Sequence, residues 1–107
     1  MERSFPGGML KGKQRSYLKG LAHELEPAVY IGKAGLTDSI VKNINENLKV
    51  HELVKVSIGK DLAMDPKEVC NEVAEMLGAH FVQAIGRKFV LYRRAADPEY
   101  RKIQLPR

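Results

Sequence analysis

A short loop with two glycines and a lysine, Gly32-Lys33-Ala34-Gly35, is the stretch of this sequence whose residue types could do chemistry. Glycine has no Cβ, so a sugar-phosphate backbone could approach the main chain closely at Gly32 and Gly35. The loop directly precedes an expected helix, where free backbone N–H groups and the helix dipole favour an anion such as phosphate. Lys33 adds a mobile cation. We interpret the loop as a candidate clamp for nucleic-acid phosphates.

Other interpretations of the loop differ in how well they fit its spacing. KH domains clamp a nucleic-acid backbone with a GxxG loop, so this pattern has a precedent on another fold. A Walker loop would need GxxxxGK followed by Ser or Thr, and a dinucleotide-binding loop would need GxGxxG. Neither is present, so nucleotide hydrolysis has no support. A mechanical interpretation stays open, in which Gly32 and Gly35 only permit a tight turn.

Basic side chains cluster in two stretches besides the loop. The formal net charge is +5, from 18 basic and 13 acidic residues. An excess of positive charge on one face attracts polyanions, although a solvated helix surface or a charged hairpin tip would look the same. The acidic segment 61–77 is excluded from this face. The first stretch holds Lys11, Lys13, Arg15 and Lys19, and the second holds Arg87 and Lys88, with Arg93 and Arg94 nearby.

Catalytic interpretations find no constellation of residues to support them. The three histidines are dispersed and have no metal-ligand spacing with Cys, Asp or Glu. Cys70 falls on the apolar side of an expected helix, which favours a core thiol over a nucleophile. His51-Glu52 is interpreted as an exposed turn, not a general base. We therefore expect no enzyme activity, no catalytic residue, no metal and no cofactor.

Four tyrosines could stack on nucleic-acid bases: Tyr17, Tyr30, Tyr92 and Tyr100. The apolar neighbours of Tyr17 and Tyr30 favour core packing for these two residues.

Hydrophobic periodicity predicts three helices and four strands in the order α-β-α-β-α-β-β. The helices are expected over 13–25, 38–49 and 66–77, with Thr37 and Asp65 as N-caps and Gly78 as a left-handed C-cap. A strand, a helix and a strand in succession predict a parallel pair with a right-handed crossover. The connection Gly86-Arg87-Lys88 predicts a β-hairpin. The strands are expected over 28–31, 53–58, 80–85 and 89–93. The predicted fold class is α/β, a single domain with a mixed four-stranded sheet packed with helices.

The length of 107 residues is typical of one domain. We assign residues 1–8 to a flexible lead-in, 9–94 to the folded domain and 95–107 to a C-terminal tail in which residues 102–105 could add a few contacts. No apolar run approaches the ~20 residues of a membrane span, and the N-terminus lacks a signal-peptide core. With a lone cysteine, Cys70, these features lead us to expect a cytoplasmic protein that has no membrane contact.

Taken together, these motifs resemble the YhbY family of bacterial RNA-binding proteins, whose fold is the CRM (chloroplast RNA splicing and ribosome maturation) domain. Three stretches carry the resemblance, and "KIQLP" near the end also fits. The combination of KQR, LAH, the GKxGLT loop and HELVKV is specific, whereas any one of these alone is not. The stretches are "LKGKQRSYLKGLAH" at 10–23, "EPAVYIGKAGLTDSIVKNINENLKVHELVKVSI" at 26–58 and "GAHFVQAIGRKFVLYR" at 78–93.

The resemblance implies a CRM-type RNA-binding domain over 9–94, similar in shape to the C-terminal domain of a bacterial translation initiation factor. It also implies association with precursors of the large ribosomal subunit, hence ribosomal RNA as partner and a role in ribosome assembly. The implied RNA contacts are Gly32, Lys33, Ala34 and Gly35, followed by Lys11, Lys13, Arg15 and Lys19. We expect a monomer without a small-molecule substrate. The alternative is an adaptor whose basic face docks on acidic ribosomal or translation proteins.

Overall fold

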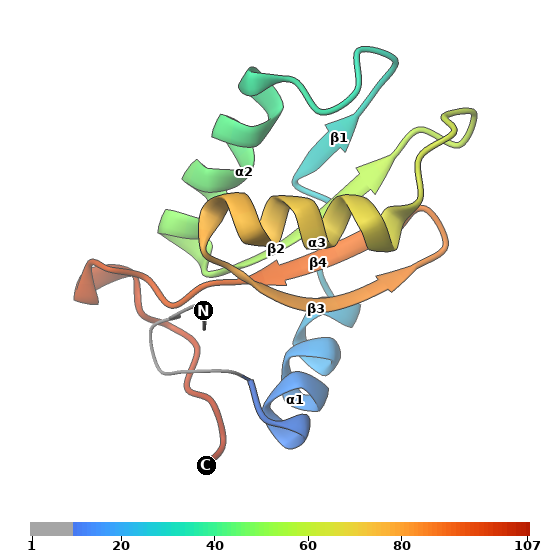
Figure 1. Cartoon of the computed structure of the whole chain (residues 1–107). Helices are drawn as coiled ribbons and strands as arrows, with labels where there is room; N and C mark the ends of the chain where they lie inside the picture. The colour runs from blue at the N-terminus through green and yellow to red at the C-terminus, as the bar shows by residue number, and fades with distance from the viewer. Residues whose placement is uncertain (1–9) are drawn as a thin grey trace, which may run out of the picture.

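The computed structural model describes residues 10–107, so the expected lead-in of residues 1–8 lies outside the described part. The elements follow the expected order, with one added 3₁₀ turn near the C-terminus (Figure 1). They are α1 (Gly12–His23), β1 (Val29–Ile31), α2 (Asp38–His51), β2 (Leu53–Ile58), α3 (Pro66–Leu77), β3 (His80–Ile85), β4 (Lys88–Tyr92) and the turn η1 (Pro98–Tyr100).

The four strands form one mixed sheet in the order β1-β2-β4-β3. β1 and β2 run parallel, which confirms the predicted β-α-β unit, and β4 lies antiparallel to both β2 and β3. The hairpin connection is the two residues Gly86-Arg87, because Lys88 already pairs with Ile85 as part of β4. The predicted fold class is therefore confirmed.

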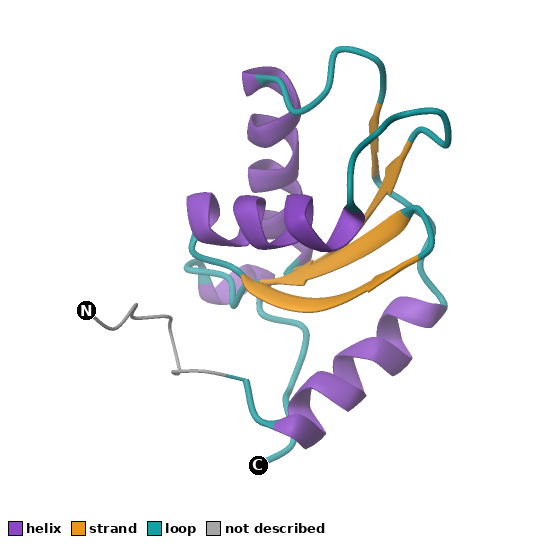
Figure 2. Cartoon of the chain, turned by 45° about the vertical axis from the view of Figure 1, so that its right-hand side comes forward, coloured by secondary structure: helices purple, strands orange, loops and turns teal. Residues whose placement is uncertain are grey.

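The helices cover the two faces of the sheet unequally. α2 and α3 lie on one face and α1 lies on the other, as Figure 2 shows. The first face holds the larger core, to which Ile44, Val73 and Phe89 contribute completely buried side chains. The second core is smaller and brings Leu18 and Ala22 of α1 against Val90. One helix cannot cover the whole of a four-stranded sheet, so part of the α1 face stays open.

Local sequence signals fix three of the six ends of the α-helices. The Thr37 side chain accepts a 3.1 Å hydrogen bond from the Ile40 amide, and the Asp65 side chain caps α3 through the Lys67 amide. Gly78 ends α3 in the left-handed conformation, as predicted. α1 ends at His23, earlier than the predicted residue 25, because the amides that follow bond to carbonyls three residues back and tighten the last turn.

The C-terminal segment is attached to the domain by Glu52. The Glu52 side chain is completely buried, with Oε2 accepting from the Ala95 amide at 2.8 Å and Oε1 from the amides of Lys102 and Ile103 at 2.9 and 3.0 Å. The expectation of an exposed His51-Glu52 turn was therefore wrong for Glu52. It failed because the partners of this carboxylate come from the far end of the chain, whereas local sequence only shows a charged residue after a helix.

Apolar contacts continue this attachment. Ile103 and Leu105 pack against the smaller core, and the Pro106 carbonyl accepts a 3.0 Å hydrogen bond from Gln14 of α1. Figure 1 shows the last residues running alongside α1. Residues 95–107 thus contribute more than the few contacts expected of them. None of the helices within residues 10–107 has the length and apolar character needed to cross a bilayer.

Candidate nucleic-acid interface

The loop Gly32-Lys33-Ala34-Gly35 is a tight turn that leads from β1 into α2. The Gly35 amide donates to the Gly32 carbonyl at 2.9 Å, and the Thr37 amide donates to the Gly35 carbonyl at 3.0 Å. Gly35 has φ = 78°, a left-handed conformation that side chains other than glycine rarely adopt. The mechanical interpretation of the glycines is therefore correct for Gly35, whose own amide is used inside the turn.

The same turn leaves other amides available to an anion. Within residues 10–107, the N–H groups of Lys33, Ala34 and Leu36 have no hydrogen-bond partner. Lys33 and Ala34 are exposed, so a phosphate could reach their amides and the Lys33 ammonium together. The Asp38 carboxylate lies in the first turn of α2 and repels an anion from that side. The geometry thus favours a phosphate at the Lys33 side of the loop.

The basic residues of α1 lie apart from this loop. Lys11, Lys13 and Lys19 are exposed, whereas Arg15 is partly buried and its Nε donates to the Phe81 carbonyl of β3 at 3.3 Å. Figures 1 and 2 place the first turn of α1 at the opposite end of the molecule from the loop that precedes α2. The two predicted groups of RNA contacts are therefore not one cluster, and a ligand touching both must span the molecule.

The two basic residues at the β3–β4 hairpin have different environments. The Arg87 guanidinium donates to the carbonyls of Met64, Gly59 and Leu62 at 3.0, 3.2 and 2.7 Å. Arg87 thus holds the loop between β2 and α3 in place. Lys88, by contrast, is exposed on the sheet and makes no such contact.

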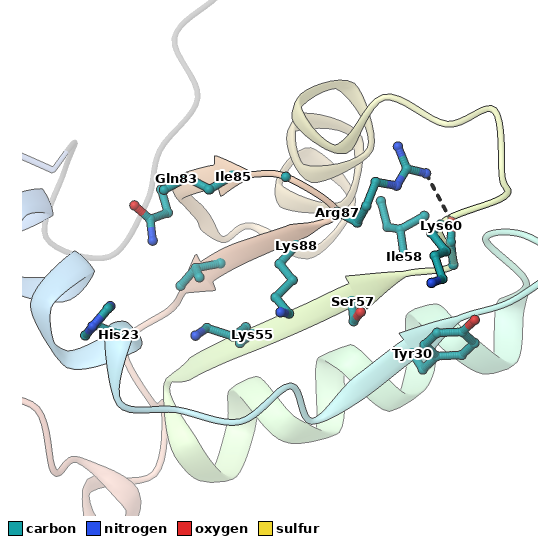
Figure 3. Close-up of a pocket in the computed structure, with 13 residues that line it drawn as sticks. His23, Tyr30, Lys55, Ser57, Ile58, Lys60, Gln83, Ile85, Arg87 and Lys88 are labelled. Carbon is teal, nitrogen blue, oxygen red and sulfur yellow. Dashed lines mark hydrogen bonds between the residues drawn. The ribbon is translucent and has the colours of Figure 1, made fainter.

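The open part of the α1 face forms a depression of about 670 Å³ next to the GKAG loop. Of the residues that define it, the sequence had singled out Lys88, as a basic residue, and Tyr30, as a possible stacking residue. Figure 3 shows most of them on the strands of the sheet. Tyr30, Ser57 and Lys88 are paired in register and make one row across β1, β2 and β4, while Lys55 and Gln83 flank Val90 in the next. The depression is lined by Tyr30, Lys55, Ser57, Lys60, Gln83 and Lys88, with His23 at the end of α1.

A signal for this face was present in the sequence. Lys55 and Ser57 alternate with Val54, Val56 and Ile58, and alternate residues of a strand lie on opposite faces of the sheet. The apolar set packs in the larger core. The polar set therefore had to lie on the other face. What the alternation could not show is that α1 leaves this part of the face uncovered.

The tyrosines are placed differently from the expectation. Tyr30 is 62% exposed and Tyr17 is 43% exposed, so the prediction that both pack in the core was wrong. Tyr17 lies on the outer side of α1, and Tyr30 lies on the uncovered face of β1. Tyr92 is the tyrosine that is buried, where its ring stacks on His80 at 6.0 Å between centroids.

Cys70 and His80 are buried titratable residues that do not line the depression. Burial raises the pKa of the Cys70 thiol to about 12, although a weak hydrogen bond to the Val90 carbonyl partly opposes the shift. The prediction of a core thiol is confirmed. Burial, followed by the nearby Arg15 cation, lowers the pKa of His80 below its ordinary 6.5. No grouping of His, Cys, Asp and Glu suited to a metal ion occurs between residues 10 and 107.

Known proteins resemble this chain over most of its length. The model of the CRS1 / YhbY (CRM) domain matches residues 10–93. A Haemophilus influenzae protein named "RNA-binding protein" is 41% identical over 98 residues, covering 92% of this chain and 96% of that protein. A Bacillus subtilis protein named "Probable RNA-binding protein YqeI" is 37% identical over 98 residues, covering 92% and 100%.

A solved structure agrees with the sequence matches. The solution structure of the hypothetical protein SAV1595 from Staphylococcus aureus superposes with a TM-score of 0.77 at 37% identity, covering 92% of this chain and all of that one. The family model covers α1 to β4, including the GKAG loop and the open sheet face. The chain therefore belongs to the CRS1 / YhbY (CRM) domain family.

Proposed function

We propose that this protein is a non-catalytic RNA-binding protein that holds RNA phosphates with the GKAG loop. The observation that carries the proposal is the turn in which Lys33 and Ala34 are exposed and their amides have no hydrogen-bond partner among residues 10–107. A phosphate there would gain charge-assisted hydrogen bonds, which are stronger than neutral ones. The names of the Haemophilus and Bacillus relatives support RNA as the ligand.

The basic residues of α1 extend the interface in this proposal. Lys11 at the N-cap and Lys13 and Lys19 within α1 present exposed cations, and Arg15 has guanidinium N–H groups left after its bond to Phe81. An RNA that contacts both the loop and α1 must pass along the molecule, whose longest extent is 39 Å. Lys88 contributes directly, whereas Arg87 acts by fixing the loop beside it.

We further propose that the RNA is ribosomal RNA in precursors of the large ribosomal subunit, and that binding assists subunit assembly in the cytoplasm. The resemblance to the YhbY family supports this step. The test is affinity purification of the tagged protein from growing cells, with and without ribonuclease. Large-subunit precursors that are lost on digestion support the proposal. Retention of acidic ribosomal proteins after digestion would instead favour the adaptor alternative.

The loop itself is tested by Lys33→Ala. Removing one phosphate contact should weaken binding of many RNAs to a similar degree and lower the slope of log affinity against log salt by about one unit. Lys49→Ala is the matched control, because Lys49 is an exposed lysine at the other end of α2, paired with Glu46 at 3.8 Å. Equal affinity and an equal slope for the two variants would contradict the role of the loop.

A further inference from the structure

We propose that the open part of the α1 face binds a nucleotide of single-stranded RNA, with its base stacked on the Tyr30 ring and its phosphates held by Lys55 and Lys88. This inference rests on the proposed function, because it names which form of RNA the protein takes and where a base is held. It concerns a surface separate from the amides of the GKAG loop.

The Tyr30 ring is exposed on the open part of the α1 face. A large aromatic ring that is 62% exposed on a sheet face has lost little contact with water, so burial against the protein does not explain it. Glycines border the ring on two sides. A Cβ at Gly32 would lie 3.5 Å from Tyr30 Cε2, and a Cβ at Gly59 would lie 2.9 Å from the Tyr30 hydroxyl. The distance at Gly32 is an ordinary contact, whereas at Gly59 the ring occupies space that a side chain would need.

The surroundings of Tyr30 in the depression are positively charged. Of the described residues that line the depression, none is acidic, whereas Lys55, Lys60 and Lys88 are cationic. Figure 3 shows the Lys55 and Lys88 side chains lying over the sheet between Tyr30 and His23. Ammonium groups gathered without a carboxylate repel one another, and an anionic ligand would relieve that repulsion. Ser57 adds a hydroxyl in the same row as Tyr30 and Lys88.

The size and shape of the depression suit a nucleotide. A volume of about 670 Å³ lies within the range of small-molecule sites, which suits one nucleotide and part of its neighbour. The site is a shallow depression on a sheet, so its ligand must be held by stacking and charge instead of enclosure. In duplex RNA the bases are stacked on one another and cannot reach a flat aromatic ring. A single strand presents free base faces, and such platforms accept them with little sequence preference.

The path of the strand connects this site with the loop. Tyr30 is two residues before Gly32, and its ring lies against that glycine. A strand whose phosphate sits on Lys33 can therefore place the next base on Tyr30 and continue over Lys88 and Lys55 toward His23 at the end of α1. The depression thus lies between the GKAG loop and the C-terminal end of α1.

The test uses the full chain and a fluorescently labelled 12-nucleotide oligouridylate, with affinity measured by anisotropy. Tyr30→Leu should weaken binding by at least about fivefold, since one base–aromatic stack contributes about 1–3 kcal/mol, which converts to about 5- to 150-fold. Tyr30→Phe should bind as the wild type does, because the ring is kept. Met76→Ala is the control, because Met76 is a large exposed side chain of α3, in the acidic segment excluded from the basic face. A loss in Tyr30→Leu no larger than in Met76→Ala overturns the inference.

A second oligonucleotide separates stacking from backbone contact. The same 12-mer without bases should bind more weakly to the wild type, and Tyr30→Leu should add little further loss. An equal loss with and without bases would contradict stacking. Tyrosine emission is a direct readout because the chain has no tryptophan. The oligouridylate should quench part of that emission in the wild type and less of it in Tyr30→Leu.

Lysine variants keep the test independent of Tyr30. Lys55→Ala and Lys88→Ala should each lower the salt slope for the 12-mer by about 0.7, the value for one phosphate contact on a single strand. Unchanged slopes overturn the inference. If the wild type binds no RNA, or if Lys33→Ala has no effect, the proposed function fails. If Lys33→Ala weakens binding but the Tyr30 and Lys55 variants do not, only the present inference fails.

Discussion

The hydroxyl of Tyr30 lies 2.9 Å from the position that a Cβ would occupy at Gly59. Gly59 follows β2 directly, and its amide donates to the Ile31 carbonyl at 2.9 Å, so the backbone there is fixed against β1. The ring of Tyr30 is the group that must move if a methyl group is added. Gly59, which follows β2, therefore sets the position of the Tyr30 side chain on the neighbouring strand β1.

Gly59→Ala should displace Tyr30 with little effect on stability. The added Cβ would also meet the Ile31 carbonyl and Leu62 Cδ1, but at ordinary contact distances of 3.5 Å, and the φ of Gly59 is not in the left-handed region. We expect a change below about 1 kcal/mol in the free energy of unfolding by urea. Affinity for the 12-mer should fall toward that of Tyr30→Leu. In the Tyr30→Leu background the same substitution should have no added effect, and full additivity would contradict the link.

Gly35→Ala should destabilise the protein through backbone strain alone. A Cβ at Gly35 would meet no atom within 4 Å, so packing does not oppose it, but φ is 78°. The left-handed conformation costs an alanine about 1–2 kcal/mol, and asparagine less. Urea denaturation should therefore rank the wild type above Gly35→Asn and Gly35→Asn above Gly35→Ala. Equal stability of the three proteins would mean that the turn relaxes to another conformation.

Glu52→Gln should loosen the C-terminal segment and destabilise the fold. The amide nitrogen of glutamine cannot accept a hydrogen bond, so at least one of the three backbone amides loses its partner in a buried place. A hydrogen bond to a charged group contributes about 1.5–3 kcal/mol, and we expect a loss of this size in the free energy of unfolding.

Hydrogen exchange at the same positions checks the cause. The amides of Ala95, Lys102 and Ile103 should exchange faster in Glu52→Gln, whereas the amides of β4 should change only with global stability. Glu46→Gln is the control, because the Glu46 side chain is exposed and its ion pair with Lys49 is long at 3.8 Å. A similar loss of stability in both variants would contradict a specific role for Glu52.

Sequence patterns predicted the elements of this fold because their signals are local. The caps at Thr37, Asp65 and Gly78 depend on hydrogen bonds and dihedral angles within a few residues, so residue type at one position is enough to indicate them. Residues whose roles depend on distant partners were not predicted. Glu52 bonds to the C-terminal segment, and Arg87 bonds to carbonyls of the loop before α3. Neither partner is visible from neighbouring residues.

The candidate site was predicted only in part for the same reason. The GKAG loop carries its signal in consecutive residues, whereas the open sheet face is assembled from all four strands. Tyr30 was misassigned because "AVYI" is apolar throughout, and an apolar run does not tell which face a helix will cover. The Tyr30 ring is exposed because α1 packs over Val90 and Leu53 and does not extend over Lys55 and Ser57.

His80 should make the protein less stable in mild acid. Burial and the Arg15 cation disfavour its imidazolium form, so its pKa in the folded state is lower than the 6.5 of the unfolded chain. The unfolded state then binds more protons below pH 6.5, and the free energy of unfolding must fall as the pH drops through that value toward the folded-state pKa. Comparing urea denaturation at pH 7.5 and pH 5.0 gives the size of the drop.

A variant assigns that drop to His80 rather than to the carboxylates. His80→Phe keeps an aromatic ring against Tyr92 but removes the titrating group, so the loss of stability between pH 7.5 and pH 5.0 should be smaller than in the wild type. His51→Gln serves as the control, because His51 is exposed at the end of α2 and its substitution should leave the loss unchanged. The same drop in His80→Phe as in the wild type would show that the imidazole is not held neutral by its surroundings.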